Sequence, residues 1–422
     1  MSPPRVAEYD RFLDCVHCGL CLSACPTYLE LGTEMDSPRG RIYVLRALED
    51  GAVDCTPDVV RHLDLCLGCR ACETACPSGV RYGELIESAR AFVETNHRRP
   101  FTDRVRRRLI TWAFPRPQRL RNLLAPLRLL ELVGLLGLVR RVSATAAMLP
   151  RLGSWEPLPE RTAAVGPERR RVGFVAGCVA QVLFARTNHA TARVLARNGC
   201  TVLTPARQGC CGALYLHAGA RDEARACARH NIDVFGADLE AIVVNAAGCG
   251  AMLKEYGKLL ADDPAYAARA REFSARVRDV TEYLAALPLV PPRGRLEARV
   301  TYHDACHLAH GQGIREAPRV LLRHIPGVEL VELPDADLCC GSAGSYNLTE
   351  PEMARRLGER KAATVRATGA TCVAAANPGC IMQIQSALDR AGIAARVKHP
   401  VELLDEAYED AVGSDRKHGG AR

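Results

Sequence analysis

The chain of 422 residues lacks any run of eighteen apolar residues, so we expect no helix that spans a membrane. Residues 1–10 lack the apolar segment of a secretory signal, which predicts a protein that stays in the reducing cytoplasm. A G-x-G-x-x-G loop is also missing, because Gly311-Gln312-Gly313 is followed by Ile-Arg-Glu. We therefore expect neither flavin nor NAD on this chain.

Cysteine, by contrast, is abundant. The chain has 20 cysteines, and its 25% charged and 48% hydrophobic residues are typical of a globular protein. In a reducing compartment, clustered thiols indicate bound metal and not disulfides. The formal net charge of +8 overstates the basicity of a metal-loaded protein, since ligating thiols bind as thiolates. The length allows two or three domains.

One cysteine pattern, C-x-x-C-x-x-C-x-x-x-C-P, occurs at residues 15–26 and again at 66–77. In such a string, three closely spaced thiolates bind one cubane and the fourth, before the proline, binds the other. The pattern predicts two [4Fe–4S] clusters. The ligands of the first would be Cys15, Cys18, Cys21 and Cys76, and those of the second Cys66, Cys69, Cys72 and Cys25.

Zinc is the alternative for these eight cysteines, because four thiolates also make a tetrahedral zinc site. Zinc modules usually separate two C-x-x-C pairs by a dozen residues or more, whereas each string here is one short run. We therefore favour iron–sulfur clusters. Helices expected at about 41–49 and at 82–96 complete a helical, two-cluster ferredoxin-like domain over residues 1–97.

Residues 98–170 form the next predicted segment, a basic amphipathic helical linker. Ten arginines lie between positions 98 and 128 against a single acidic residue, Asp103, and an apolar stretch at 129–139 predicts a short helix. Such a segment could lie on an anionic membrane surface, which would make the protein peripheral on the inner face of the cell membrane. It could equally pack on a partner subunit. Nucleic-acid binding is not expected, because aromatic residues are few and no recognised motif is present.

The rest of the chain is a duplication. A buried strand ends near Cys178 and another near Cys306, Cys-Cys-Gly follows at 210–212 and at 339–341, and Gly-Cys follows at 248–249 and at 379–380. The repeat predicts two α/β domains with parallel sheets, at 171–292 and 293–413, followed by a disordered tail at 414–422. In such folds the cysteines lie at the carboxyl ends of strands, where sites are found.

Several chemistries remain open for the duplicated cysteines. Each half could hold a further iron–sulfur cluster, or its vicinal pair could act as a redox-active dithiol; buried structural thiols are the remaining alternative. His303 and His307, on either side of Cys306, could be second-shell donors or satisfied histidines. The eight cysteines are Cys178, Cys210, Cys211, Cys249, Cys306, Cys339, Cys340 and Cys380.

Together, the two strings and the two Cys-Cys-Gly repeats resemble the iron–sulfur subunits of flavo-oxidoreductases related to heterodisulfide reductase. The local sequences at 76–83, 302–313 and 339–353 resemble in particular the iron–sulfur subunits of glycolate oxidase. This resemblance implies an electron-transfer subunit of a glycolate dehydrogenase complex. Flavin-containing partner subunits would oxidise glycolate to glyoxylate, and electrons would pass through this chain to a quinone or another carrier.

The chain departs from the fullest family pattern at two places. That pattern ends in C-x-x-C, but Ala246 and Asn377 stand at its first cysteine, which leaves four thiols per half and puts a five-thiolate cluster in question. Alternatives to the main hypothesis are the same subunit for glycerol 3-phosphate or lactate, a disulfide reductase acting at the Cys-Cys-Gly centres, and a zinc-bound adaptor. Because oxidation of a 2-hydroxy acid needs a two-electron acceptor such as flavin, we expect no catalytic residue for it on this chain.

Overall fold

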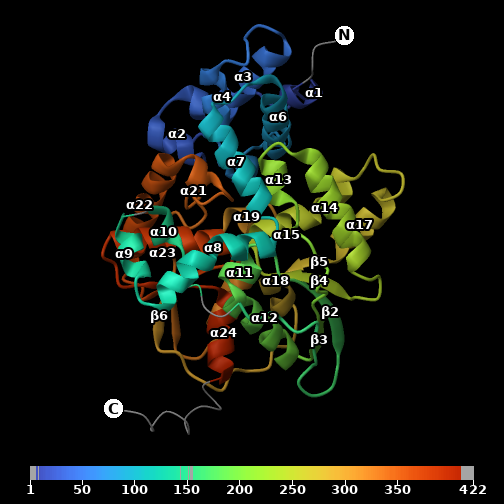
Figure 1. Cartoon of the computed structure of the whole chain (residues 1–422), viewed down its shortest axis with the longest axis vertical. Coiled ribbons are helices and arrows are strands. Elements are labelled where there is room, and N and C mark those ends of the chain that lie inside the picture. Colours follow the sequence, from blue (N-terminus) through green and yellow to red (C-terminus); the bar gives the residue numbers. More distant parts are fainter. Residues whose placement is uncertain (1–5, 8, 143, 151, 153–154, 410–422) are drawn as a thin grey trace.

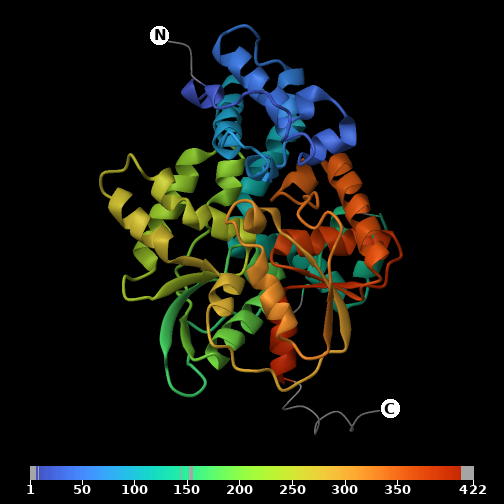
Figure 2. The same ribbon diagram turned by 180° about the vertical axis from the view of Figure 1, so that it is seen from behind.

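The computed structural model describes residues 6–7, 9–142, 144–150, 152 and 155–409; the predicted tail at 414–422 lies outside these residues. A helical N-terminal module sits at one end of the molecule, and two α/β domains lie side by side beneath it (Figures 1 and 2). The linker helices cross one face of the α/β domains (Figure 1). The predicted fold class, a helical module followed by duplicated parallel-sheet domains, is confirmed.

The N-terminal module contains the predicted helix at 82–96 with the predicted bounds. The helix expected at 41–49 begins earlier, at Pro38, because Ser37 accepts a hydrogen bond from the Gly40 N–H and proline suits the first helical turn. The helices are α1 (Asp10–Leu13), α2 (Pro26–Leu31), η1 (Glu34–Asp36), α3 (Pro38–Glu49), α4 (Pro57–Asp64), α5 (Ala71–Thr74) and α6 (Tyr82–Asn96).

The linker is helical, but the single helix expected at 129–139 is wrong. The chain breaks at Gly134, whose φ of 76° lies in the left-handed region, and the apolar stretch is divided between two helices. Leu120 and Leu124 pack into a core with residues of both α/β domains. None of the described helices is long and apolar enough to cross a membrane. The helices are α7 (Phe101–Ala113), α8 (Pro117–Leu132), α9 (Leu136–Val142) and α10 (Ala144–Met148).

Both α/β domains are built on parallel sheets. The first has the order β1-β3-β2-β4-β5 and the second β7-β6-β8-β9. Among the strands of the described residues, β1 alone runs antiparallel to its neighbour, β3, and it comes from residues expected in the linker. The strands of the first sheet are β1 (Arg161–Thr162), β2 (Arg170–Val175), β3 (Cys200–Leu203), β4 (Ala241–Val244) and β5 (Val277–Asp279). Those of the second are β6 (Ala298–His303), β7 (Val328–Val331), β8 (Cys372–Ala375) and β9 (Arg396–Lys398).

Helices cover the sheets, and the two domains share one apolar core. Phe174 and Val243 of the first sheet are in the same buried cluster as Tyr302 and Ala374 of the second. The first domain contains α11 (Ala180–Leu183), α12 (Ala185–Arg197), α13 (Ala213–His217), α14 (Arg221–Val234), α15 (Ala247–Lys254), α16 (Tyr256–Leu259), α17 (Ala267–Arg276) and α18 (Val280–Ala285). The second contains α19 (Cys306–Ala309), α20 (Glu316–Arg323), α21 (Tyr346–Thr349), α22 (Pro351–Thr368), α23 (Pro378–Arg390) and α24 (Pro400–Glu409).

Candidate iron–sulfur centres

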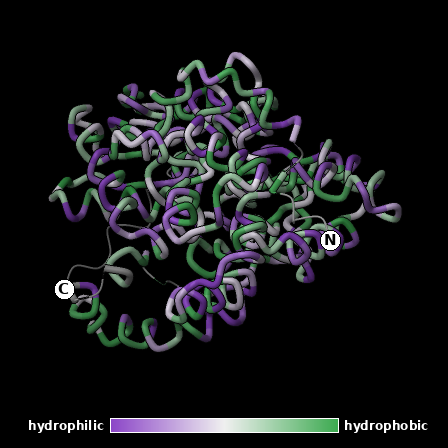
Figure 3. Tube along the Cα trace, turned by 90° about the horizontal axis from the view of Figure 1, so that it is seen from above, coloured by the Kyte–Doolittle hydropathy of each residue, from purple (hydrophilic) through white to green (hydrophobic). Residues whose placement is uncertain are grey.

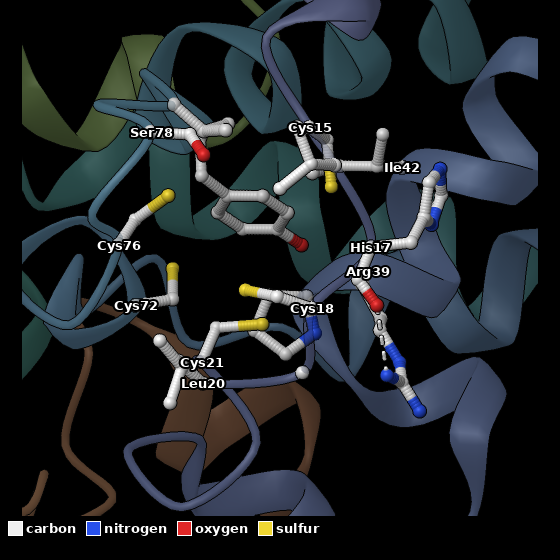
Figure 4. Close-up of a pocket in the computed structure, with 15 residues that line it drawn as sticks. Cys15, His17, Cys18, Leu20, Cys21, Arg39, Ile42, Cys72, Cys76 and Ser78 are labelled. Atoms are coloured by element: carbon white, nitrogen blue, oxygen red, sulfur yellow. Dashed lines mark hydrogen bonds between the residues drawn. The ribbon is translucent and has the colours of Figure 1, made fainter.

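A first cavity in the N-terminal module collects cysteines from both strings. It is lined by Cys15, Cys18, Cys21 and Cys76, and also by Cys72. Figure 4 shows their sulfur atoms turned toward the same space. The thiols predicted for the first cluster therefore lie together, although Cys76 is more than fifty positions from the others in the chain. Four thiols around one space are a donor set that fits a [4Fe–4S] cluster.

A second cavity lies deeper in the same module. Its sulfur lining consists of Cys25, Cys66, Cys69 and Cys72, which are the four thiols predicted for the second cluster. Cys72 lines both cavities, so the two centres are adjacent. The Gly68 N–H points to Cys66 Sγ at 3.4 Å, and the Tyr82 hydroxyl donates to the same sulfur at 3.6 Å. Such donors stabilise thiolate charge.

A buried arginine lies beside the second cavity, and the sequence pattern did not single it out. Arg41 on α3 is 1% exposed and lines the cavity. Its guanidinium donates to the His62 carbonyl at 2.7 Å and to Thr27 Oγ1 at 3.1 Å, and it lies 3.6 Å from Asp36. Its positive charge therefore faces the thiols. No sequence signal distinguishes Arg41 from its surface neighbours, since its burial depends on the packing of α3 against α4.

Burial makes these thiols poor acids when no metal is present. It raises the pKa of Cys69 and of Cys72 well above the ordinary value. In the duplicated domains, a neighbouring thiol together with burial raises the pKa of Cys178 and of Cys306 in the same way. Binding of a metal to these sulfurs must therefore release protons.

The eight cysteines of the Cys-Cys-Gly domains line one large cavity. It has a volume of about 670 Å³ and lies between the two domains. Within the first half, Cys178 Sγ lies 3.5 Å from Cys210 Sγ. The sequence predicted four thiols at the edge of each sheet, and the structure in addition brings both groups to the same space. Each half offers four sulfurs, a donor set that fits an iron–sulfur centre.

Apolar side chains of the linker form another wall of this cavity. The cavity is lined by Leu109 of α7 and by Phe114, which directly follows that helix. It is also lined by three leucines of α8: Leu120, Leu123 and Leu124. Leu109 and Leu123 are also 47% and 45% exposed, so they border both the cavity and the outer surface. The linker thus separates the cysteines from solvent. The sequence predicted that the linker is helical, but it contained no signal that these helices would lie against the cysteine-lined cavity.

The N-terminal module meets the second Cys-Cys-Gly domain close to the cysteines. Cys69 of the second cavity is in the same buried cluster as Cys306 and Cys339. The Tyr346 hydroxyl donates to the Leu65 carbonyl at 2.9 Å across this contact. Apolar packing therefore brings the second ferredoxin-like centre next to the thiols of the second repeat.

Charged groups hold the same module on the first Cys-Cys-Gly domain. Arg70 contacts Glu255 at 2.6 Å, and Glu87 Oε1 lies 3.8 Å from Nδ1 of His217. Burial and the nearby Glu255 raise the pKa of Glu87 to about 7. The His217 ring is 5.6 Å from the ring of His307, so residues of all three domains meet here. The sequence did not indicate that Glu87 and His217 would meet here, because neither residue belongs to a recognisable motif.

The two histidines predicted near Cys306 have different surroundings. His307 Nδ1 lies 3.5 Å from Cys306 Sγ, and His307 lines the large cavity. His303 at the end of β6 is fully buried. Burial and the Lys361 cation hold the pKa of His303 well below its usual value, with the Ala336 carbonyl acting in the opposite direction. Burial and the Lys361 cation both favour the neutral form of the His303 ring.

Family models match the N-terminal module, the linker and both Cys-Cys-Gly repeats. A 4Fe-4S dicluster domain model matches residues 11–80, and a cysteine-rich domain model matches 172–254 and 300–385. The linker region model of the glycolate oxidase iron–sulfur subunit matches 102–158. The probable glycolate oxidase iron–sulfur subunit of Bacillus subtilis (strain 168) is 39% identical, over 94% of both chains. The chain belongs to the family of glycolate oxidase iron–sulfur subunits.

Other relatives agree with this family. The glycolate oxidase iron–sulfur subunit of Escherichia coli (strain K12) is 39% identical over 96% of both chains. Lactate utilization protein A of Shouchella clausii (strain KSM-K16) is 33% identical but matches only 56% of this chain, over 98% of its own length. The lactate alternative therefore fits less well than membership of the glycolate oxidase family. The predicted iron–sulfur cofactors are confirmed at the level of the domains.

Proposed function

We propose that this glycolate oxidase iron–sulfur subunit carries electrons from a flavin-containing partner that oxidises glycolate to glyoxylate. The observation that supports this most strongly is the continuous series of thiol-lined sites, from the outer cavity through Cys72 and Cys69 to Cys339. When bound, iron–sulfur clusters at these sites supply one-electron carriers. The chain's own residues hold the carriers close together and exclude water from the inner ones.

The ligands we propose follow the two cavities. Cys15, Cys18, Cys21 and Cys76 would hold the outer cluster, and Cys25, Cys66, Cys69 and Cys72 the inner one. The Cys18 side chain is exposed, whereas Cys66, Cys69 and Cys72 are buried. Electrons would therefore enter at the outer cluster and leave toward the second Cys-Cys-Gly domain.

The surface around the outer cavity supports docking of the partner subunit at this end. Val16 and Leu20, which line the cavity, are 67% and 57% exposed. Exposed apolar residues in one place commonly mark a protein interface. We propose that the flavin subunit covers them.

The large cavity supports a lipid-soluble acceptor such as a quinone. Its walls are mainly apolar, and the eight thiols lie along it. An apolar redox carrier in this space would lie next to the centres of the duplicated domains. Leu109, at its border with the surface, lies on α7 together with the exposed Arg104 and Arg108.

The test of the function uses the isolated subunit and the reconstituted complex. We expect the isolated, metal-loaded subunit to leave glycolate unchanged, because the flavin that would accept two electrons from the substrate is expected on the partner. With the flavin partner present, glycolate should reduce the iron–sulfur centres, observed as bleaching of their visible absorbance. Reduction by lactate or glycerol 3-phosphate, but not by glycolate, would overturn the proposed substrate.

Membrane contact through the linker is a further part of the proposal. Leu129 and Leu132 near the end of α8 are 62% and 75% exposed, and Leu138 on α9 is 58% exposed. Figure 3 shows a hydrophobic stretch of chain along the lower edge of the molecule. Arg104, Arg108 and Arg116 are exposed on the same linker, a combination that suits an anionic bilayer surface.

Replacing Leu129 and Leu132 together with serine should weaken binding to vesicles of phosphatidylcholine and phosphatidylglycerol by about a hundredfold or more, because each leucine contributes about 1.5–3 kcal/mol on burial. Flotation of the vesicles measures the bound fraction. The matched control is Val165→Ser, an exposed valine outside these helices. Equal flotation of the double variant and the control would show that the linker serves another partner.

A further inference from the structure

His303 is the feature of the second repeat that the electron-transfer role leaves unexplained. Its side chain is 0% exposed, and apart from the neighbouring Ala336 carbonyl neither Nδ1 nor Nε2 has a hydrogen-bond partner among the described residues. Burying a polar group without a partner is destabilising, so such a group usually has a function or a missing partner. His399, equally buried, differs because its Nδ1 accepts the Val401 N–H at 3.1 Å.

Two sulfur atoms lie close to the ring of His303. A ring nitrogen of His303 and the sulfur atoms of Cys340 and Cys380 all lie within 4.8 Å of one another, and all three residues are buried. One nitrogen and two sulfurs at this separation can bind the same metal centre without any rearrangement of the backbone. Imidazole and thiolate are both ligands of iron–sulfur centres.

The first repeat provides an internal comparison. β2 and β6 occupy the same place in their sheets, and each ends three residues before its cysteine. Val175 pairs with Val244 in the first sheet at the position where His303 pairs with Ala375 in the second. The repeats thus have the same four thiols, but at this strand-end position the second has an imidazole where the first has a valine. At a buried strand end, packing alone favours an apolar residue such as the valine of the first repeat. A histidine at the equivalent position therefore indicates an added function.

We propose that His303 is a direct nitrogen ligand of an iron–sulfur centre in the second Cys-Cys-Gly domain, together with the thiolates of Cys340 and Cys380. The proposal rests on that domain holding such a centre. Asn377, three residues before Cys380, donates to Cys380 Sγ at 3.5 Å, so it orients that sulfur. The centre of the first repeat would have sulfur ligands only, and the two repeats would differ in reduction potential, because imidazole ligands raise it.

The test is pulsed EPR of the full chain, purified anaerobically with ¹⁵N-histidine incorporated. We expect a nitrogen coupling on one centre that disappears in His303→Val, which copies the residue of the first repeat, and persists in His307→Val. His303→Cys should retain the iron, lose the coupling and shift the midpoint of that centre to lower potential. It also serves as the second variant if His303→Val fails to fold.

Two results would overturn the proposal in distinguishable ways. If Cys340→Ser removes a signal that His303→Val leaves unchanged, the centre exists and the histidine is not its ligand. If neither variant changes any signal or the iron content, or if zinc replaces iron in this domain, the second repeat holds no iron–sulfur centre. In that case the assignment on which the proposal rests also fails.

Discussion

Cys76→Ser is expected to abolish the same EPR signal as Cys15→Ser, although the two residues belong to different strings. Cys25→Ser should abolish the signal that Cys66→Ser removes. The reason is spatial: Cys76 lines the outer cavity with the first string, and Cys25 lines the inner cavity with the second. Each substitution should lower the iron content by about four atoms per chain. Iron and sulfide analysis with EPR of the dithionite-reduced protein measures both effects.

Cys55→Ser is the matched control for this series. Cys55 lies in the same module but outside both strings and both cavities, so its substitution should leave both signals and the full iron content. Loss of the Cys66 signal on substitution of Cys76 would contradict the crossed arrangement of ligands. A colourless protein that binds zinc at these cysteines would contradict the clusters themselves.

Arg41→Met should lower both the stability of the protein and the reduction potential of the inner cluster. Methionine keeps much of the volume of the side chain but removes a cation that is buried beside the inner cavity and Asp36. Removing one partner of a buried ion pair costs about 3 kcal/mol or more. The midpoint of denaturant unfolding, followed by loss of the visible absorbance under anaerobic conditions, should fall accordingly. Loss of the positive charge should also shift the inner cluster to lower potential.

Arg46→Met on the same helix is the control. Arg46 contacts Asp50 at 3.7 Å, and both side chains are nearly half exposed; surface pairs of this kind contribute about 0–1 kcal/mol. An equal shift of the unfolding midpoint in the two variants would show that burial of Arg41 contributes nothing specific. An unchanged potential in Arg41→Met would show that its charge does not act on the inner centre.

The sequence by itself determined those features that depend on residues close together in the chain. The spacing of cysteines within a dozen residues predicts cluster chemistry, because a short chain can present its thiolates to one centre in few ways. The repeat of strand, Cys-Cys-Gly and Gly-Cys predicted two parallel sheets, because alternating strands and helices pack in few arrangements. The apolar face of α6 likewise predicted its bounds.

The tertiary structure alone decided how these elements face one another. Nothing in either repeat shows that the two groups of thiols share a cavity, that Cys69 packs against Cys339, or that α7 and α8 close the space. These contacts join residues that are far apart in the chain, and they depend on which apolar surfaces exclude water together. Likewise His303 has the sequence pattern of an ordinary histidine before a cysteine. Its place among buried sulfurs follows from the register of β6 with β8 and from the packing of the Cys340 loop and α23.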